Sequence, residues 1–208
     1  MHHRSVPAVL ADLAAPLAAA AGYRAVMLVT DPNPDPDSGC DVPCALRVAD
    51  DGPIPILTIG DGLLRGGPAT PDGRIAAAAM AHALVCFDWL VEAEERRWLW
   101  LTRLATVIVV AGMMLGSVPV VVAAIPASAL ALLGLLAARR RSEYAVDRTA
   151  VRLLTEAGLD GPACLRELLA DIAAHEPAVY RRVAWVVSGL PTAAARLRAL
   201  EAGPAPAA

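Results

Sequence analysis

The chain contains no lysine, and all 18 of its basic residues are arginine. Acidic residues number 21, so the formal net charge is -3. This balance lacks the strongly basic character of a nucleic-acid-binding domain, and we expect no nucleic-acid partner. Charged residues make up only 19% of the 208 residues, whereas 57% are hydrophobic. In soluble domains about a quarter of all residues are charged, so this composition favours a membrane protein.

Charge is completely absent from residues 104–138, a run of 35 residues. As one helix this run would measure roughly 52 Å, well beyond a hydrocarbon core of about 30 Å. We therefore expect two membrane-spanning helices of roughly 17–20 residues each, joined near residues 116–119 or near Pro126. The alternative is a buried helical hairpin in a soluble protein, although apolar runs of this length rarely have that role.

Arginines flank the charge-free run on both sides: Arg96, Arg97 and Arg103 precede it, and Arg139, Arg140 and Arg141 follow it. The positive-inside rule then places both flanks in the cytoplasm, which agrees with an even number of spans. Trp98 and Trp100 stand where an aromatic belt would lie, and Gly112 and Gly116 match a small-residue packing motif. The sequence predicts an integral membrane protein in contact with the lipid bilayer, with both termini and the soluble part in the cytoplasm.

Outside this run, the pattern of apolar and turn residues predicts a small sheet between helices. One helix is expected to end at Gly22, and further helices are expected at residues 75–89, 142–154, 163–174 and 180–187. The expected strands cover residues 23–30, 44–48 and 54–59. Ser5 and Pro7 are suited to the start of the first helix, and residues 50–53 form a turn signal. This order predicts an α+β fold that is mainly helical.

The chain has only four cysteines, and their spacing matches no complete disulfide or zinc framework. Cys40 and Cys44 lie four residues apart in a Pro/Asp-rich segment. They are suited to a local disulfide, to half of a metal site, or to two thiols in a reducing compartment. Cys164 lies in a helical pattern and is expected to be a small core residue.

His82 and Cys86 are four residues apart in the apolar helix predicted for residues 75–89, so both side chains share one face. Zinc hydrolases present two ligands with this spacing, usually as H-E-x-x-H. Here the five positions read His82-Ala83-Leu84-Val85-Cys86, and the chain has no other H-E-x-x-H. A candidate ligand pair is therefore present without the glutamate that would activate water.

Several segments in the same order resemble the HtpX-like and CAAX prenyl protease type of membrane zinc metallopeptidase. The segments are residues 59–64 (IGDGLL), residues 79–84 (AMAHAL), the apolar spans, residues 141–147 (RSEYAVD) and residues 190–196 (LPTAAAR). The family's corresponding patterns are V-L-A-H-E-L, R-x-x-E-Y-x-A-D and H-P-P-T-x-x-R. The resemblance covers roughly residues 5–202.

The resemblance implies a gluzincin-like metallopeptidase fold with an inserted transmembrane hairpin. Residues 1–97 and 142–202 would form the two halves of the peptidase-like domain, residues 98–141 the hairpin, and residues 203–208 a disordered tail. His82, Cys86 and Glu143 would be the metal ligands, and Asp147 would orient His82. Arg196 would be the arginine of the closing motif.

The departures from the family decide the expected function. The general base is replaced by Ala83, the second histidine by Cys86, and the closing histidine is lost at or near Leu190. Since alanine cannot accept a proton, we expect a membrane-anchored pseudoprotease that acts as a partner or scaffold for another protein. One alternative is an atypical zinc metalloendopeptidase that uses His82, Cys86 and Glu143. The other is an unrelated membrane protein in which His82 is a core histidine. Whether zinc is bound stays open.

Overall fold

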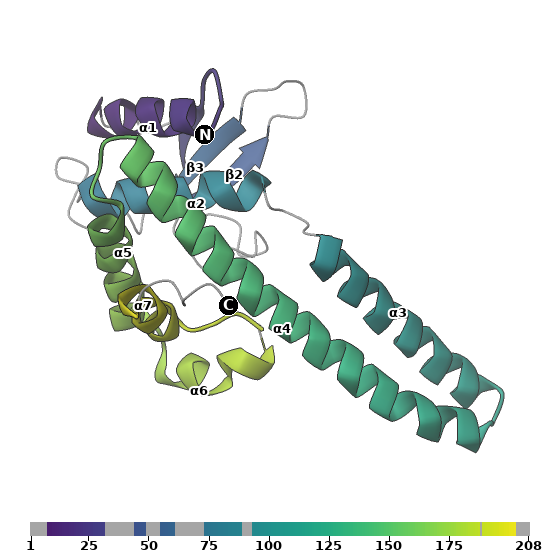
Figure 1. Ribbon diagram of the computed structural model, residues 1–208. Helices are drawn as coiled ribbons and strands as arrows, with labels where there is room; N and C mark the ends of the chain where they lie inside the picture. Colours follow the sequence, from purple (N-terminus) through teal and green to yellow (C-terminus); the bar gives the residue numbers. More distant parts are fainter. Residues whose placement is uncertain are drawn as a thin grey trace. The chain divides into compact units, whose positions relative to one another are not determined.

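The structure is a computed structural model that describes residues 8–31, 44–48, 55–60, 73–88, 93–187 and 189–202. It is mainly helical with one small sheet (Figure 1). The chain divides into two units, and each is discontinuous in sequence. Unit 1 comprises Met1–Leu90, Val146–Glu176 and Ala193–Ala208, and unit 2 comprises Val91–Ala145 and Pro177–Thr192.

The sheet of unit 1 has three strands in the order β1-β3-β2. The strands are β1 (Met27–Asp31), β2 (Cys44–Val48) and β3 (Pro55–Gly60). The central strand β3 pairs parallel to β1, with Met27 opposite Ile56, and antiparallel to β2, with Cys44 opposite Ile59. The strand predicted for residues 23–30 is shorter than expected, because pairing to β3 begins only at Met27.

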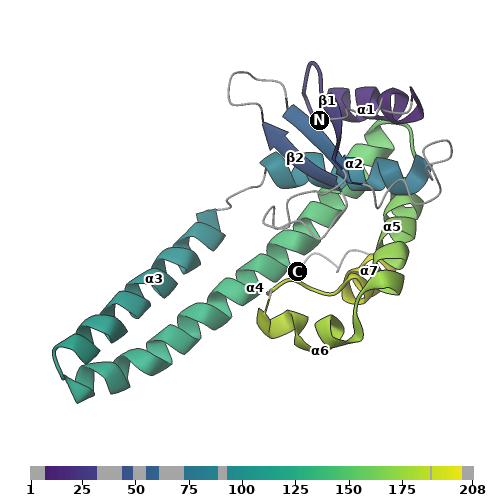
Figure 2. The ribbon, with the colours of Figure 1, turned by 180° about the vertical axis from the view of Figure 1, so that it is seen from behind.

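Helices and helix parts complete unit 1. They are α1 (Ala8–Ala20), α2 (Gly73–Asp88), the last part of α4 (Val118–Glu156), α5 (Gly161–His175) and α7 (Ala193–Glu201). Helix α2 runs alongside the strands and also packs against α1 and α5 (Figure 2). Gly22 ends α1 with a φ of 81°, as predicted, since this backbone conformation favours glycine. Cys164 is buried in the core, also as predicted.

Alanine dominates the buried face of α2. Residues 76–79 are four consecutive alanines, and each has an exposed fraction of 0%. Helices usually bury one stripe, but here small side chains let the neighbouring elements approach α2 closely on several sides. The result is a helix enclosed by unit 1, and it is this helix that carries His82.

Unit 2 contains a hairpin formed by α3 (Ala93–Met114) and the first part of α4, which lie side by side (Figure 1). The turn covers residues 115–117, with Gly116 at a φ of 61°. The first of the two predicted turn positions is therefore confirmed, and Pro126 lies inside α4. The helix predicted for residues 142–154 is not a separate element, because it forms the last part of α4, which continues without a break to Glu156.

Apolar side chains of the hairpin face outward. Met114 and Leu115 are 84% and 82% exposed, and large hydrophobic residues are exposed at many positions between Trp100 and Leu133. A helical hairpin in the core of a soluble protein would bury such residues. Both α3 and α4 are long and apolar enough to cross a membrane.

The two arms of the hairpin differ in the length of their charge-free part. In α4 it covers residues 118–138, about 32 Å, whereas in α3 it covers residues 104–114, only about 16 Å. Arg103, predicted as part of the flank, therefore lies deeper along the hairpin than Arg96 and Arg97 do. Its guanidinium lies 5.8 Å from the centroid of the Trp100 ring, one turn nearer the base of the hairpin. Arginine commonly extends in this way to bring its charge to the membrane interface.

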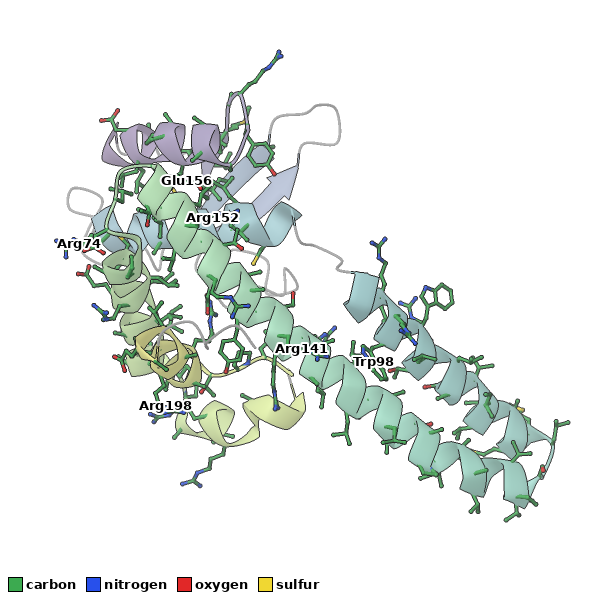
Figure 3. The ribbon with its side chains drawn as sticks, viewed as in Figure 1. Arg74, Trp98, Arg141, Arg152, Glu156 and Arg198 are labelled. Carbon is green, nitrogen blue, oxygen red and sulfur yellow. The ribbon has the colours of Figure 1, made fainter. Side chains whose placement is uncertain are left out.

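Glycine makes the close approach of α3 and α4 possible at two levels. A Cβ on Gly112 would lie 3.0 Å from Val121, and a Cβ on Gly134 would overlap the ring of Trp98, which lies between the helices (Figure 3). Gly112 therefore acts in packing as its motif predicts, whereas Gly116 serves the turn instead.

We expect Gly134→Val to lower the free energy of unfolding by about 1–3 kcal/mol, because the added methyl groups collide with Trp98. Adding Trp98→Ala to the same chain should recover part of this loss. Gly116→Asn is the matched control, since its side chain would enter open space in a conformation that asparagine tolerates. Thermal unfolding in detergent measures all four proteins. Equal midpoints for the wild type and Gly134→Val would contradict the packing.

Unit 2 also contains α6 (Ala178–Val187). After it, Gly189 adopts a φ of 70°, and a Cβ at this position would lie 2.6 Å from the side chain of Leu136 and 3.5 Å from that of Arg139, both on α4. Several predictions lie outside the described residues: the helix start at Ser5 and Pro7, Cys40, the turn at residues 50–53, residues 61–64 and the tail at residues 203–208.

Candidate functional site

His82 stands at the centre of a buried polar cluster in unit 1. It belongs to α2 and is only 2% exposed. One turn later on the same helix, Cys86 brings its Sγ to 3.4 Å from His82 Nε2. The predicted pairing of these two side chains on one helix face is therefore present, and both atoms are of the kind that binds zinc.

The other ring nitrogen of His82 faces an ion pair. Arg196 donates from Nε to Oδ2 of Asp147 at 2.9 Å and from Nη2 to Oδ1 at 2.5 Å. Such a two-pronged arginine–carboxylate pair is both strong and directional. The Nδ1 of His82 lies 3.4 Å from Nη2 of Arg196 and 3.6 Å from Oδ1 of Asp147.

Three helices supply this cluster: α2 carries His82, α4 carries Asp147 and α7 carries Arg196. Asp147 and Arg196 are each 6% exposed. Charges leave water at a high cost in free energy unless they are paired and hydrogen-bonded, so the two-pronged contact is what makes their burial tolerable. The sequence predicted that Asp147 would orient His82, but it did not predict that Arg196 would join them.

Both ring nitrogens of His82 have polar neighbours. Nδ1 faces the guanidinium of Arg196 and the carboxylate of Asp147, and Nε2 faces the thiol of Cys86. A guanidinium only donates, whereas a thiol and a neutral imidazole can each donate or accept, so these contacts are compatible with a proton on either nitrogen. A neutral imidazole binds a metal ion through the nitrogen that lacks the proton.

The acidity of Asp147 reflects two opposing effects. Burial alone would raise its pKa, but its contacts with His82 and Arg196 and the positive charge of Arg196 outweigh burial and hold the pKa below its ordinary value. The carboxylate therefore remains charged at neutral pH, as the ion pair requires.

This lowered pKa predicts a loss of stability in acid. The contribution of Asp147 is fully present above the pKa of an unfolded aspartate, about 3.9, and is lost as the pH falls through the lower pKa of the folded state. We expect the thermal midpoint of the wild type to fall more steeply below about pH 4 than that of Asp147→Asn. Melting curves between pH 7 and pH 3 would measure the difference. Parallel pH profiles would contradict this prediction.

Ala83 is also buried, with an exposed fraction of 2%, and it belongs to the hydrophobic core of unit 1. In the family resemblance this is the position of the general base. A base must reach both water and substrate, so a position inside the core offers no chemical use for one. Alanine there acts as a packing residue.

The residues predicted as metal ligands do not form a complete set. Glu143 lies on α4, one turn before Asp147, and is half-buried. Among the described residues, no group of three or more His, Cys, Asp or Glu side chains is placed to hold a metal ion. His82 and Cys86 are two converging donors, whereas a zinc site in a protein usually has three or four protein ligands.

One side chain that the sequence analysis left without a role supports the cluster from a distance. Glu176 follows α5, and its Oε1 accepts a hydrogen bond of 2.8 Å from the backbone N–H of Ala193, the first residue of α7. An acidic group at a helix N-terminus satisfies a free N–H and favours the helix dipole. Glu176 thereby fixes the start of the helix that carries Arg196.

Comparisons of the chain with protein families, with curated proteins and with solved structures find no match. The arguments on function therefore rest on the residues and their geometry alone.

Proposed function

We propose that the protein is a membrane-anchored pseudoprotease: a gluzincin-like metallopeptidase fold that no longer hydrolyses peptide bonds and serves as a partner or scaffold in the membrane. The observation that carries this proposal is Ala83, buried at the position of the general base. Loss of a general base typically lowers a rate by about 10²–10⁴.

The charge pattern around His82 also supports this proposal. Nε2 of His82 faces Cys86 and Nδ1 faces the Asp147–Arg196 pair, so both ring nitrogens have partners within the protein. The cluster is satisfied within the protein and needs no ligand to balance its charges. It supports a structural role in holding α2, α4 and α7 together.

The test is hydrolysis by the purified full-length chain in detergent, with casein and with a membrane-protein substrate, in the presence of zinc or a chelator. We expect no cleavage that depends on zinc and is abolished by the chelator. Zinc-dependent, chelator-sensitive cleavage by the unmodified chain would overturn the proposal. His82→Ala distinguishes this activity from that of a contaminating protease, which would persist in the variant.

One distance favours a second candidate, an atypical zinc site that uses His82, Cys86 and Glu143. Two ligands on a tetrahedral zinc ion lie roughly 3.5 Å apart, and Nε2 of His82 lies 3.4 Å from Sγ of Cys86. Elemental analysis of the purified chain tests this candidate. One zinc per chain that is lost in Cys86→Ser and in Glu143→Gln would support it, and a chain without stoichiometric zinc would exclude it.

A further inference from the structure

Charge is distributed very unevenly between the two units. Unit 2 contains eight arginines and four glutamates, a net charge of +4, whereas unit 1 contains ten arginines and seventeen acidic residues, a net charge of -7. The overall charge of -3 hides this separation. Such asymmetry points to an acidic partner for the basic part of a chain.

Five of the eight arginines of unit 2 lie near the base of the α3–α4 hairpin. Trp98 lies against Gly134, which sets the relative level of the two helices. Arg96 and Arg97 are one or two residues before Trp98, and residues 139–141 begin five residues after Gly134. At 1.5 Å per residue, all of these positions fall within roughly 10 Å along the hairpin.

Helix α6, in the same unit, carries two more arginines. The chain after α6 comes close to α4, since a Cβ added at Gly189 would lie 2.6 Å from the side chain of Leu136 and 3.5 Å from that of Arg139. Arg181 and Arg182 are exposed on α6, as Arg96 and Arg97 are on α3. We call this set the arginine collar: Arg96, Arg97, Arg139, Arg140, Arg141, Arg181 and Arg182.

We propose that the arginine collar binds the headgroups of anionic phospholipids at the membrane surface. This inference rests on the proposed membrane anchoring of the hairpin. Basic clusters next to a membrane span attract anionic lipids, and a guanidinium can bind phosphate through two parallel hydrogen bonds. Because the chain has no lysine, every basic contact in the collar would be of this type.

Because unit 1 is acidic, the attraction of the protein to anionic lipids should come from the collar. A net charge of -7 is repelled by an anionic surface, so unit 1 offers no general electrostatic attraction that could replace the collar. Exposed arginines of unit 1, such as Arg166 and Arg198, therefore provide matched controls.

Tryptophan fluorescence provides the test, since Trp98 and Trp100 lie beside the collar. The full-length chain carrying Trp89→Phe and Trp185→Phe is placed in phosphatidylcholine vesicles. In separate samples, 30% of the lipid is replaced by brominated phosphatidylcholine or by brominated phosphatidylglycerol, where bromine quenches nearby tryptophan. We expect the anionic lipid to be enriched around the protein by about threefold, and less at high salt, which screens the charges.

Two double variants locate the effect. Arg181→Gln with Arg182→Gln should remove about half of the enrichment, whereas Arg166→Gln with Arg198→Gln should leave it unchanged. Equal quenching by both lipids, or an enrichment that survives the collar variant, would overturn the inference while leaving membrane anchoring intact. Quenching by neither lipid would overturn the anchoring itself, and the inference with it. Equal melting temperatures of the two double variants confirm that both are folded.

Discussion

Replacing Arg196 with methionine should lower the free energy of unfolding by about 3–5 kcal/mol, the usual effect of removing one partner from a buried ion pair. The carboxylate of Asp147 would remain buried, because α4 and its neighbours enclose it, but it would lose both of its strong hydrogen bonds. Denaturant unfolding in detergent, followed by circular dichroism, measures the change.

Arg198→Met is the matched control for this prediction. Arg198 lies two residues after Arg196 on α7, and its side chain is exposed and points away from the helix (Figure 3). Its replacement should therefore change the free energy of unfolding by less than about 0.5 kcal/mol. Adding Asp147→Leu to Arg196→Met should restore much of the loss, since the unpaired charge is then removed. If Arg196→Met and Arg198→Met unfold at the same denaturant concentration, the buried pair is not what holds α4 and α7 together.

Ala83→Glu should also be strongly destabilising, by roughly 3 kcal/mol or more, because an unpaired carboxylate would enter the core. We further expect that this variant gains no zinc-dependent hydrolysis, although it restores the family's H-E pair after His82. The position is 2% exposed, so its side chain has no access to water from which a nucleophile could form.

Ala170→Glu provides the comparison, because Ala170 is exposed on α5 and glutamate is a good helix former. Its stability should stay within about 0.5 kcal/mol of the wild type. A stable Ala83→Glu variant that cleaves casein in a chelator-sensitive way would instead mean that position 83 opens to solvent. In that case the catalytic frame would be intact except for one side chain.

The sequence predicted local features well where one residue type determines the backbone. Gly22 and Gly116 adopt positive φ angles where the predicted helix ends and the predicted turn lie. Pro126 was an equally plausible turn position from its chemistry alone, yet it lies within α4. In an apolar segment, ending a helix leaves backbone groups unsatisfied, and continuing past one proline costs less than a turn there.

The candidate site was only partly predictable, because some of its residues are far apart in the sequence. The pairs His82 with Cys86, and Glu143 with Asp147, follow from four-residue spacing on a helix. Arg196 is 114 residues from His82, and no periodicity connects them. Its place beside Asp147 depends on how α7 packs, which depends in turn on the Glu176 contact at the start of that helix. Such long-range pairing is a property of the packed fold.

The alanines of α2 have a consequence for how the site is assembled. A methyl side chain has no rotamers to lose on folding, whereas a leucine or methionine gives up roughly 0.5–2 kcal/mol of conformational entropy. The stretch at residues 76–79, with Ala81 and Ala83, therefore orders almost without side-chain entropy loss. Within this part of α2, Met80 and His82 are the residues whose side-chain rotation must be restricted. Within this stretch of α2, the side-chain entropy cost of ordering the helix is thereby confined to Met80 and His82, and His82 is the one that contacts Arg196 and Cys86.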